Sequence, residues 1–269
     1  LVDGAPVVAI GGSASLRRDG LGAFQELDQV SVMKPITRWA ARAFDIRRIP
    51  ELVDRAFREA FCGRPGPTYL DLPFDIIQGT CEDTDVGWDN STFPASGRQR
   101  VAADTAYVER ALDLIGKAQR PIVLFGSGVL WSGAALQLRA FVERSGIPFY
   151  ATPQGRGAIP EDHPLSFLEA RSSAFREADL VIVCGTRLNY VIGHARSPRF
   201  GADAKFIQID IDGSELGRTR KVDVGIIGDV GAVLQQFVDQ NKGNLDTARH
   251  QAWVKQLREV SAAKSKQLD

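Results

Sequence analysis

Five short apolar runs in the second part of the chain, each followed by a glycine or a polar turn, constrain its fold most strongly. They are PIVLFGSG, IPFYAT, ADLVIVCGT, KFIQIDID and VDVGIIGD. Each run is unbroken rather than alternating in polarity, as in strands buried on both faces of a parallel sheet. Helical patterns fall at 107–117, about 131–145, about 172–177 and 232–240. The alternation predicts an α/β, Rossmann-like domain whose parallel sheet is covered by helices on both faces.

The first 77 residues show a shorter form of the same alternation of strands and helices. The run PVVAI at 6–10 stops at Gly11-Gly12, as a buried strand would. From Pro50, apolar residues at three- and four-residue spacing predict a helix that ends near Gly63; they are Leu52, Val53, Ala56, Phe57 and Ala60. After the turn RPGP, TYLDLP is a further strand. A strand, a helix and a strand form only part of a domain.

The remaining segments set the predicted domain boundaries. Residues 78–104 are polar, rich in Asp, Ser, Thr and Gly, and lack apolar periodicity, so we expect a linker between domains. The Rossmann-like domain would cover 105–242, and 243–269 would form a tail or linker that leads elsewhere, with a charged helix or linker from Trp253 onwards. Since Leu1 stands where an initiator Met is usual, we expect this sequence to lie within a longer chain.

Charge and cysteine usage exclude several classes of function. The 33 basic and 33 acidic residues balance, which argues against a nucleic-acid binder or a polybasic membrane-surface protein. No apolar run approaches the roughly 18 residues of a membrane span. Three widely spaced cysteines and three histidines without ligand spacing predict neither a disulfide framework nor a metal site, and a reducing cytoplasm is expected. No nucleophile–base motif such as G-x-S-x-G occurs.

The predicted strand ends are candidate nucleotide-binding loops. They read Gly126-Ser127-Gly128, Gly185-Thr186-Arg187, Asp210-Ile211-Asp212 and Gly228-Asp229-Val230. In open α/β sheets ligands bind at this edge, where glycine lets the backbone approach a phosphate, arginine binds it, and aspartate accepts from a ribose. A single such end is more simply a tight turn, and Trp131 replaces the third glycine of the dinucleotide fingerprint. Four such ends on one sheet favour nucleotide binding.

Several basic residues follow these ends in the sequence. For most of them the simpler interpretation is solvated surface charge. They are Arg196, Arg199, Arg218, Arg220 and Lys221.

Longer segments resemble a known enzyme family. AFQELDQVSVMKPITRWA and RRIPELVDRAFREAFCGRPGPTYLDLPFDI are similar to the later half of the pyrimidine-binding domain of thiamine diphosphate (ThDP) enzymes. RPIVLFGSGV, GIPFYATPQGRGAIPEDHPL, ADLVIVCGTRLNY, KFIQIDID and VDVGIIGDV follow the order of that family's central domain, so the resemblance covers nearly the whole chain. LNYVIGHARSPRF and IDGSELGRTRKVDVGIIGDV look closest to 2-hydroxyacyl-CoA lyases and benzaldehyde lyase, with acetolactate synthases and oxalyl-CoA decarboxylases further away.

This resemblance implies a fragment of a ThDP- and Mg²⁺-dependent carbon–carbon lyase that acts on 2-hydroxyacyl-CoA type substrates and assembles as a homodimer or homotetramer. The family's activating glutamate would precede Leu1, and the GDG motif of its diphosphate-binding domain is absent, so we expect no turnover from this chain alone. Gly11, Gly12 and Ser13 match a loop near the cofactor. Phe24, Gln25 and Glu26 match a segment that lines the substrate side across a dimer interface, although Gln25 alone would equally suit a solvent-facing helix start.

The resemblance also gives the central domain a ligand site. The family binds FAD there in acetolactate synthases, ADP or CoA-like nucleotides in CoA-linked lyases, and nothing in others. By position the site would be lined by Ser127, Gly128, Arg156, Thr186, Arg187, Asp210, Ile211 and Asp229. The arginines favour an ADP-type ligand, with an empty site next.

Two alternative functions remain. One is an acetolactate synthase-like transferase with FAD in the central domain. The other is a stand-alone nucleotide-binding module without catalysis, or an NAD-using deacylase of the sirtuin type. The absence of a zinc-binding CxxC pair counts against the deacylase.

Overall fold

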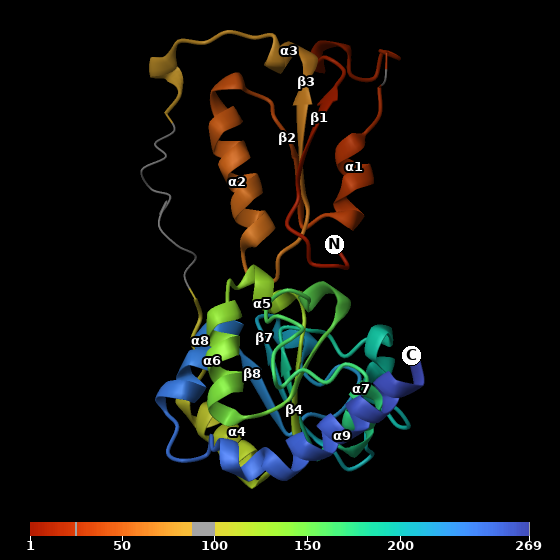
Figure 1. Cartoon of the computed structure of the whole chain (residues 1–269). Coiled ribbons are helices and arrows are strands. Elements are labelled where there is room, and N and C mark those ends of the chain that lie inside the picture. Colours follow the sequence, from red (N-terminus) through yellow and green to blue (C-terminus); the bar gives the residue numbers. More distant parts are fainter. Residues whose placement is uncertain (25, 88–99, 269) are drawn as a thin grey trace. The chain divides into compact units, whose positions relative to one another are not determined.

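The structure, a computed structural model, describes residues 1–24, 26–87 and 100–268 of the chain. It divides into two compact units, Leu1–Arg98 and Gln99–Asp269 (Figure 1). The division falls within the predicted linker 78–104, of which 88–99 lie outside the described residues.

The first unit is built on a three-stranded parallel sheet. Its strands are β1 (Val8–Ser13), β2 (Trp39–Arg42) and β3 (Thr68–Pro73), in the order β1-β3-β2. In Figure 1, α1 (Gln29–Met33) and α2 (Ile49–Phe61) lie on opposite sides of this sheet, and α3 (Phe74–Ile77) follows β3. Leu52, Ala56 and Ala60 of α2 are buried as predicted, but Phe57 is 50% exposed.

Two features of this sheet differ from the prediction. β1 does not stop at Gly11-Gly12, because both glycines pair with β3, opposite Asp71 and Leu72. A side chain at Gly11 would collide with the Tyr69 ring, so packing alone requires glycine there. β2 was not predicted, since WAAR is only four residues long and ends in an arginine.

The second unit contains a five-stranded parallel sheet, and all five predicted strands are confirmed. They are β4 (Pro121–Phe125), β5 (Phe149–Ala151), β6 (Leu180–Cys184), β7 (Lys205–Asp210) and β8 (Val224–Ile227). The order β5-β4-β6-β7-β8 means that the chain first moves to one side of β4 and then crosses to the other. The point where the direction reverses, between β4 and β6, is where doubly wound sheets bind ligands.

Helices cover both faces of this sheet, as predicted. On one side in Figure 1 lie α4 (Thr105–Lys117), α6 (Ala135–Ser145) and α8 (Val230–Asp239); on the other lie α7 (Arg171–Glu177) and α9 (Gln251–Leu268). Alternate residues of β4 serve the two buried clusters, with Val123 and Phe125 in one and Ile122 and Leu124 in the other. The alternation explains why the strand is apolar throughout.

One helical prediction is wrong, and the segment expected to be a tail packs on the sheet. The single helix expected at 131–145 is two helices, α5 (Ser127–Trp131) and α6, because Gly133 adopts a left-handed conformation between them. The expected tail 243–269 contains α9, which packs on the sheet and belongs to the second unit. Trp253 and Leu257 are buried, and the Trp253 indole donates to the carbonyl of Pro121 at 3.1 Å.

The connection between β6 and β7 lacks an α-helix. Residues 185–204 contain instead a 3-10 stretch, Tyr190–Ala195, in which His194 and Ala195 adopt positive φ. The connection from β7 to β8 likewise has only a 3-10 turn, Gly213–Glu215, whereas those from β4 to β5 and from β5 to β6 carry α-helices. A crossover without an α-helix has fewer internal partners for its backbone.

Among the described residues, no helix is long and apolar enough to cross a membrane.

Candidate functional site

The loops after β4 and β6 meet at the point where the strand order reverses. The backbone N–H of Gly128 donates to the carbonyl of Gly185 at 2.9 Å. A Cβ on Gly128 would lie 2.6 Å from the Cα of Gly185, and one on Gly126 would lie 2.6 Å from the Cβ of Thr186. These glycines therefore allow two loops to pack together, and the Gly128 N–H, which we expected to face a phosphate, already has a partner.

Arg187 stands at the same edge and has a different character. Its side chain is half-buried, and no hydrogen bond or ion pair joins its guanidinium to another described residue. Thr186, which precedes Arg187, is half-buried. Ser127, the first residue of α5 in the loop after β4, is half-buried as well. Because β4 and β6 are neighbours, with Phe125 paired to Cys184, the structure brings these predicted residues to one place.

Asp210 ends β7, the next strand along the edge. Asp210 is buried, its Oδ1 accepts from the N–H of Asp212 at 2.9 Å, and its carbonyl accepts from Gly228 N–H at 3.0 Å. Ile211 follows and is half-buried. These contacts fix the ends of β7 and β8 against each other and hold both residues at the edge.

Asp229 caps the helix that follows β8. Its Oδ1 accepts from Ser132 Oγ at 2.7 Å and from the N–H of Gly231 at 3.0 Å, and the Arg100 guanidinium lies 3.6 Å away. The residue is buried, as an N-cap at the start of α8 in the interior requires. A structural role is therefore sufficient reason for this aspartate, and its contact with a nucleotide stays a prediction.

Arg156 follows the turn after β5, whose Gly155 packs closely against Phe125 and Gly126 at the end of β4. It forms an ion pair with Glu161 at 2.9 Å and lines a cavity of about 200 Å³ together with Arg171. Arg171 also lines a second cavity, of about 470 Å³, with Arg199 and Pro198.

Arg171 is a cation that sequence reasoning missed. Burial lowers the pKa of its guanidinium, and the charges of Arg199 and Arg156 lower it further. Its Nε is buried and has no hydrogen-bond partner among the described residues. The sequence signal was weak, because Arg171 begins a short helix, is followed by two serines and reads as a surface residue.

A cavity of about 930 Å³ opens at the carboxyl end of β1 in the first unit. Gly12, Ser13 and Phe24 line it, and the Ser13 Oγ is buried without a partner among the described residues. Phe24 is 88% exposed. Three of the six residues predicted near ThDP or substrate thus share one cavity.

The other three residues of that prediction are Gly11, Gln25 and Glu26. Gly11 lies inside β1 against Tyr69 and is not among the lining residues. Glu26 accepts from the N–H groups of Gly20 and Ala23 at 2.6 and 2.8 Å, which lowers the pKa of its carboxyl group. Gln25 lies outside the described residues. The predicted loop Gly11-Gly12-Ser13 is the last part of a strand, because all three residues pair with β3.

A protein family matches the second unit, and known proteins are similar to nearly the whole chain. Residues 108–237 match the family described as thiamine pyrophosphate enzyme, central domain. 2-Hydroxyacyl-CoA lyase 1 of Mus musculus is 35% identical over 255 residues, which cover 94% of this chain and 43% of that protein. The 2-hydroxyacyl-CoA lyase of Arabidopsis thaliana is 37% identical, over 85% of this chain and 40% of that protein.

A decarboxylase is similar to nearly the same extent. Oxalyl-CoA decarboxylase of Escherichia coli K12 is 34% identical over 91% of this chain and 44% of that protein. The chain spans less than half the length of each of these relatives. The ordered similarity through both units, together with the match of 108–237, shows that the chain belongs to the thiamine pyrophosphate enzyme family.

Proposed function

We propose that the protein is a ThDP- and Mg²⁺-dependent lyase that cleaves or forms a carbon–carbon bond in 2-hydroxyacyl-CoA type substrates. The observation that carries this proposal is the similarity to 2-hydroxyacyl-CoA lyase 1 of Mus musculus, which runs through both units at 35% identity. The reaction would release, or in reverse join, a one-carbon formyl unit and a carbonyl compound. A cytoplasmic location and a homodimer or homotetramer belong to the same proposal.

The second unit would bind the ADP-type part of a nucleotide or of CoA at the carboxyl edge of its sheet. Arg187 fits this role, since it is a half-buried cation without an acidic partner among the described residues, and arginine binds phosphate oxygens in a bidentate manner. Ser127 and Thr186 would lie beside the phosphates, and Asp210 and Ile211 beside the ribose. Arg171, whose Nε has no hydrogen-bond partner among the described residues, offers a second cation for a phosphate-bearing ligand.

The described residues fit ThDP and Mg²⁺ only in part. The cavity lined by Gly12, Ser13 and Phe24 offers room beside a strand end for the organic part of a cofactor. Within 1–24, 26–87 and 100–268 no cluster of three or more His, Cys, Asp or Glu could hold a metal ion, so no Mg²⁺ ligand is assigned in this chain. When bound, ThDP supplies the electron sink for carbon–carbon bond chemistry, and the protein supplies orientation.

Calorimetric titration with ADP, CoA, FAD and NAD tests the nucleotide site directly. We expect ADP and CoA to bind, and we expect Arg187→Met to weaken ADP binding about tenfold, as loss of a charge-assisted contact would. Arg139→Met is the matched control, because Arg139 is exposed on α6 and pairs with Glu143. FAD binding with flavin absorbance would favour the acetolactate synthase-like alternative, and failure of all four ligands would contradict a nucleotide site.

Turnover tests the lyase activity separately. The protein at the full length of its relatives, supplied with ThDP, Mg²⁺ and a 2-hydroxyacyl-CoA, should release formyl-CoA that mass spectrometry detects. The 269-residue chain should give no turnover under the same conditions. Oxalyl-CoA is the comparison substrate, and a clear preference for it would replace the lyase assignment with a decarboxylase.

A further inference from the structure

The crossover from β6 to β7 depends on side chains for its backbone hydrogen bonds. Residues 185–204 contain no α-helix, yet Leu188, Ile192, Ala195 and Phe200 within it are buried. Buried carbonyl groups without helical partners require donors from elsewhere, because leaving them unpaired is costly. His194 and Ala195 also hold positive φ, which non-glycine residues adopt only when the surroundings enforce it.

Two adjacent residues, Thr219 and Arg220, supply most of these donors. Thr219 Oγ1 donates to the carbonyl of Leu188 at 2.6 Å, and Arg220 Nη1 donates to that of Ala195 at 2.6 Å. Arg220 Nη2 donates to the last part of the crossover, at the carbonyls of Gly201 (3.0 Å), Ala202 (3.0 Å) and Ala204 (2.9 Å). The crossover is thus held at its start, its middle and its end by a single dipeptide.

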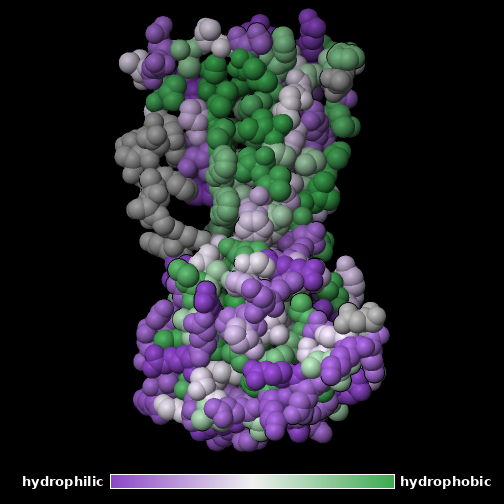
Figure 2. Space-filling view, viewed as in Figure 1, coloured by the Kyte–Doolittle hydropathy of each residue, from purple (hydrophilic) through white to green (hydrophobic). Residues whose placement is uncertain are grey.

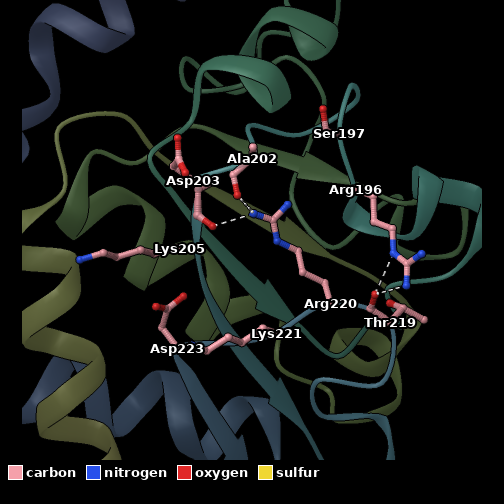
Figure 3. A pocket seen from close by; sticks show the side chains of 10 residues that line it. Arg196, Ser197, Ala202, Asp203, Lys205, Thr219, Arg220, Lys221 and Asp223 are labelled. Atoms are coloured by element: carbon pink, nitrogen blue, oxygen red, sulfur yellow. Dashed lines mark hydrogen bonds between the residues drawn. The ribbon is translucent and has the colours of Figure 1, made fainter.

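The dipeptide is itself fixed in place. Arg196 donates from Nε and Nη2 to the carbonyl of Thr219 at 3.0 and 2.9 Å, and the Arg220 guanidinium lies 4.3 Å from the centre of the Phe206 ring. Arg196, Ala202, Thr219 and Arg220 line one pocket, and Figure 3 shows Arg220 extending across it towards Ala202, with Arg196 directed at Thr219. Solvated surface charge was expected for most of these basic residues; Arg220 is an exception, because it is half-buried and paired with backbone carbonyls, whereas Arg196 is exposed although it donates to Thr219.

The contacts reach from one edge of the sheet to the other. Ala204 precedes β7 and lies at its amino end, whereas Leu188 directly follows Arg187, beyond the carboxyl end of β6. A bond from Thr219 to the Leu188 carbonyl restrains the peptide group between Leu188 and Asn189, one residue beyond Arg187. Loss of this restraint would let Arg187 leave its position without removing the arginine itself.

We propose that Thr219 and Arg220 are positioning residues, which hold the crossover so that Arg187 faces an anionic ligand at the carboxyl edge. The inference rests on the proposed nucleotide site and adds to it the residues that set its affinity. Thr219 acts at the residue beside Arg187, and Arg220 acts through the strained backbone at Ala195 and the end of the crossover. Neither side chain needs to touch the ligand.

Variants that remove donors but keep shape test the proposal. Thr219→Val removes one hydroxyl donor, Arg220→Met removes all the donors of the guanidinium, and Arg220→Lys keeps the charge with fewer, differently directed donors. The control is Arg218→Met in the same loop, because Arg218 is exposed and pairs with Glu215 rather than with the crossover. Calorimetry measures the Kd for ADP at a temperature at which circular dichroism shows every variant to be folded.

We expect a Kd about fivefold weaker in Thr219→Val and about tenfold weaker in Arg220→Met, with Arg220→Lys between Arg220→Met and the unchanged protein. Arg218→Met should leave the Kd unchanged. In the double variant with Arg187→Met, Thr219→Val should add little, because both changes remove the same ligand contact. Unchanged ADP affinity in folded Thr219→Val and Arg220→Met, or full additivity with Arg187→Met, overturns the proposal.

Hydrogen exchange separates this inference from the proposed function. Amides of 188–204 should exchange faster in Thr219→Val and Arg220→Met than in Arg218→Met, with no ligand added. If the unchanged protein binds no ADP, the nucleotide site is wrong and Arg187 has no ligand to be positioned for. If it binds ADP but exchange in 188–204 is the same in all variants, the nucleotide site stands and the positioning role of Thr219 and Arg220 is wrong.

Discussion

Polar side chains at the carboxyl edge of the second sheet differ in whether their hydrogen-bonding groups already have partners within the protein. Asp229 is buried and accepts from Ser132 Oγ and the first N–H groups of α8, whereas Arg187 has no such partner among the described residues. Both are polar residues at strand ends, and the sequence offers no way to distinguish them. The distinction depends on what lies opposite, here Ser132, which is 97 residues away from Asp229 in the sequence.

Replacement of Asp229 tests its role as a cap. We expect Asp229→Ala to lower the free energy of unfolding by about 1–2 kcal/mol, because the N–H groups of Gly231 and Ala232 lose their acceptor. Urea unfolding measures the change. Asp104→Ala is the matched control, since Asp104 caps α4 at an exposed position and its loss should cost less. An equal or larger effect of Asp104→Ala would argue against burial as the source of the difference.

His250 makes stability depend on pH. It is fully buried, its Nδ1 lies 3.0 Å from the carbonyl of Ser145, and burial lowers its pKa below the ordinary value of 6.5. The unfolded chain therefore takes up a proton below about pH 6.5 that the folded protein excludes. Stability is fully present above that pH and falls as the pH drops from there towards the lower pKa of the folded state.

The contribution of His250 can be isolated by mutation. In His250→Asn the amide can replace Nδ1 but does not titrate, so the loss of stability between pH 7.5 and pH 5.5 should be smaller than in the unchanged protein. Urea unfolding at the two pH values gives both differences. Equal losses in the two proteins would show that another group causes the pH dependence.

At the scale of elements, apolar runs in the sequence predicted most of the strands. Elements without such a run form because distant segments of the chain pack together. β4 to β8 are visible in the sequence because both faces of the sheet are covered, so every residue of β4 and β6 is buried. β2 was invisible because its residues are only half-buried and include Arg42, which pairs with Asp71. Nothing in its local composition reports that partner.

The same limit applies to the candidate site. Sequence spacing correctly placed Ser127, Thr186, Arg187 and Asp210 at adjacent strand ends. It could not show that the glycines of these loops are used for contact between the loops, nor that Arg171 is half-buried without an acid. Those properties arise where segments distant in the sequence meet, and single-sequence periodicity carries no information on them.

Helix α9 offers a test at this scale. Its buried positions Trp253 and Leu257 pack with Ile122 and Phe206 in the cluster beneath it, although most of its other residues are polar. We expect Leu257→Ala to lower the free energy of unfolding by about 2–5 kcal/mol, as for other fully buried leucines. Lys255→Ala, on the exposed side of the helix, should change it little. If Leu257→Ala has no greater effect than Lys255→Ala, α9 is a tail as the sequence suggested.

At the scale of the whole molecule, the two units differ in how far their apolar residues are buried. The second unit holds two large buried clusters, and every member lies between Ala103 and Leu257. The first unit buries a cluster of only Ala43, Leu52 and Leu70, and Figure 2 shows apolar residues over its visible surface. Large exposed side chains of this unit include Ile10, Leu21, Phe24, Phe44, Phe57, Phe61, Phe74 and Ile77.

This contrast predicts that the two units differ in independent stability. A chain of residues 100–269 should fold cooperatively, because its buried clusters need no residue from outside it. A chain of residues 1–87 should lack a cooperative thermal transition and bind the dye ANS, because its core is too small to offset the entropy of ordering. Thermal circular dichroism and ANS fluorescence on both chains measure this. A cooperative transition of residues 1–87 without ANS binding would contradict this prediction. The first unit would then be an autonomous domain that folds although its apolar side chains are exposed.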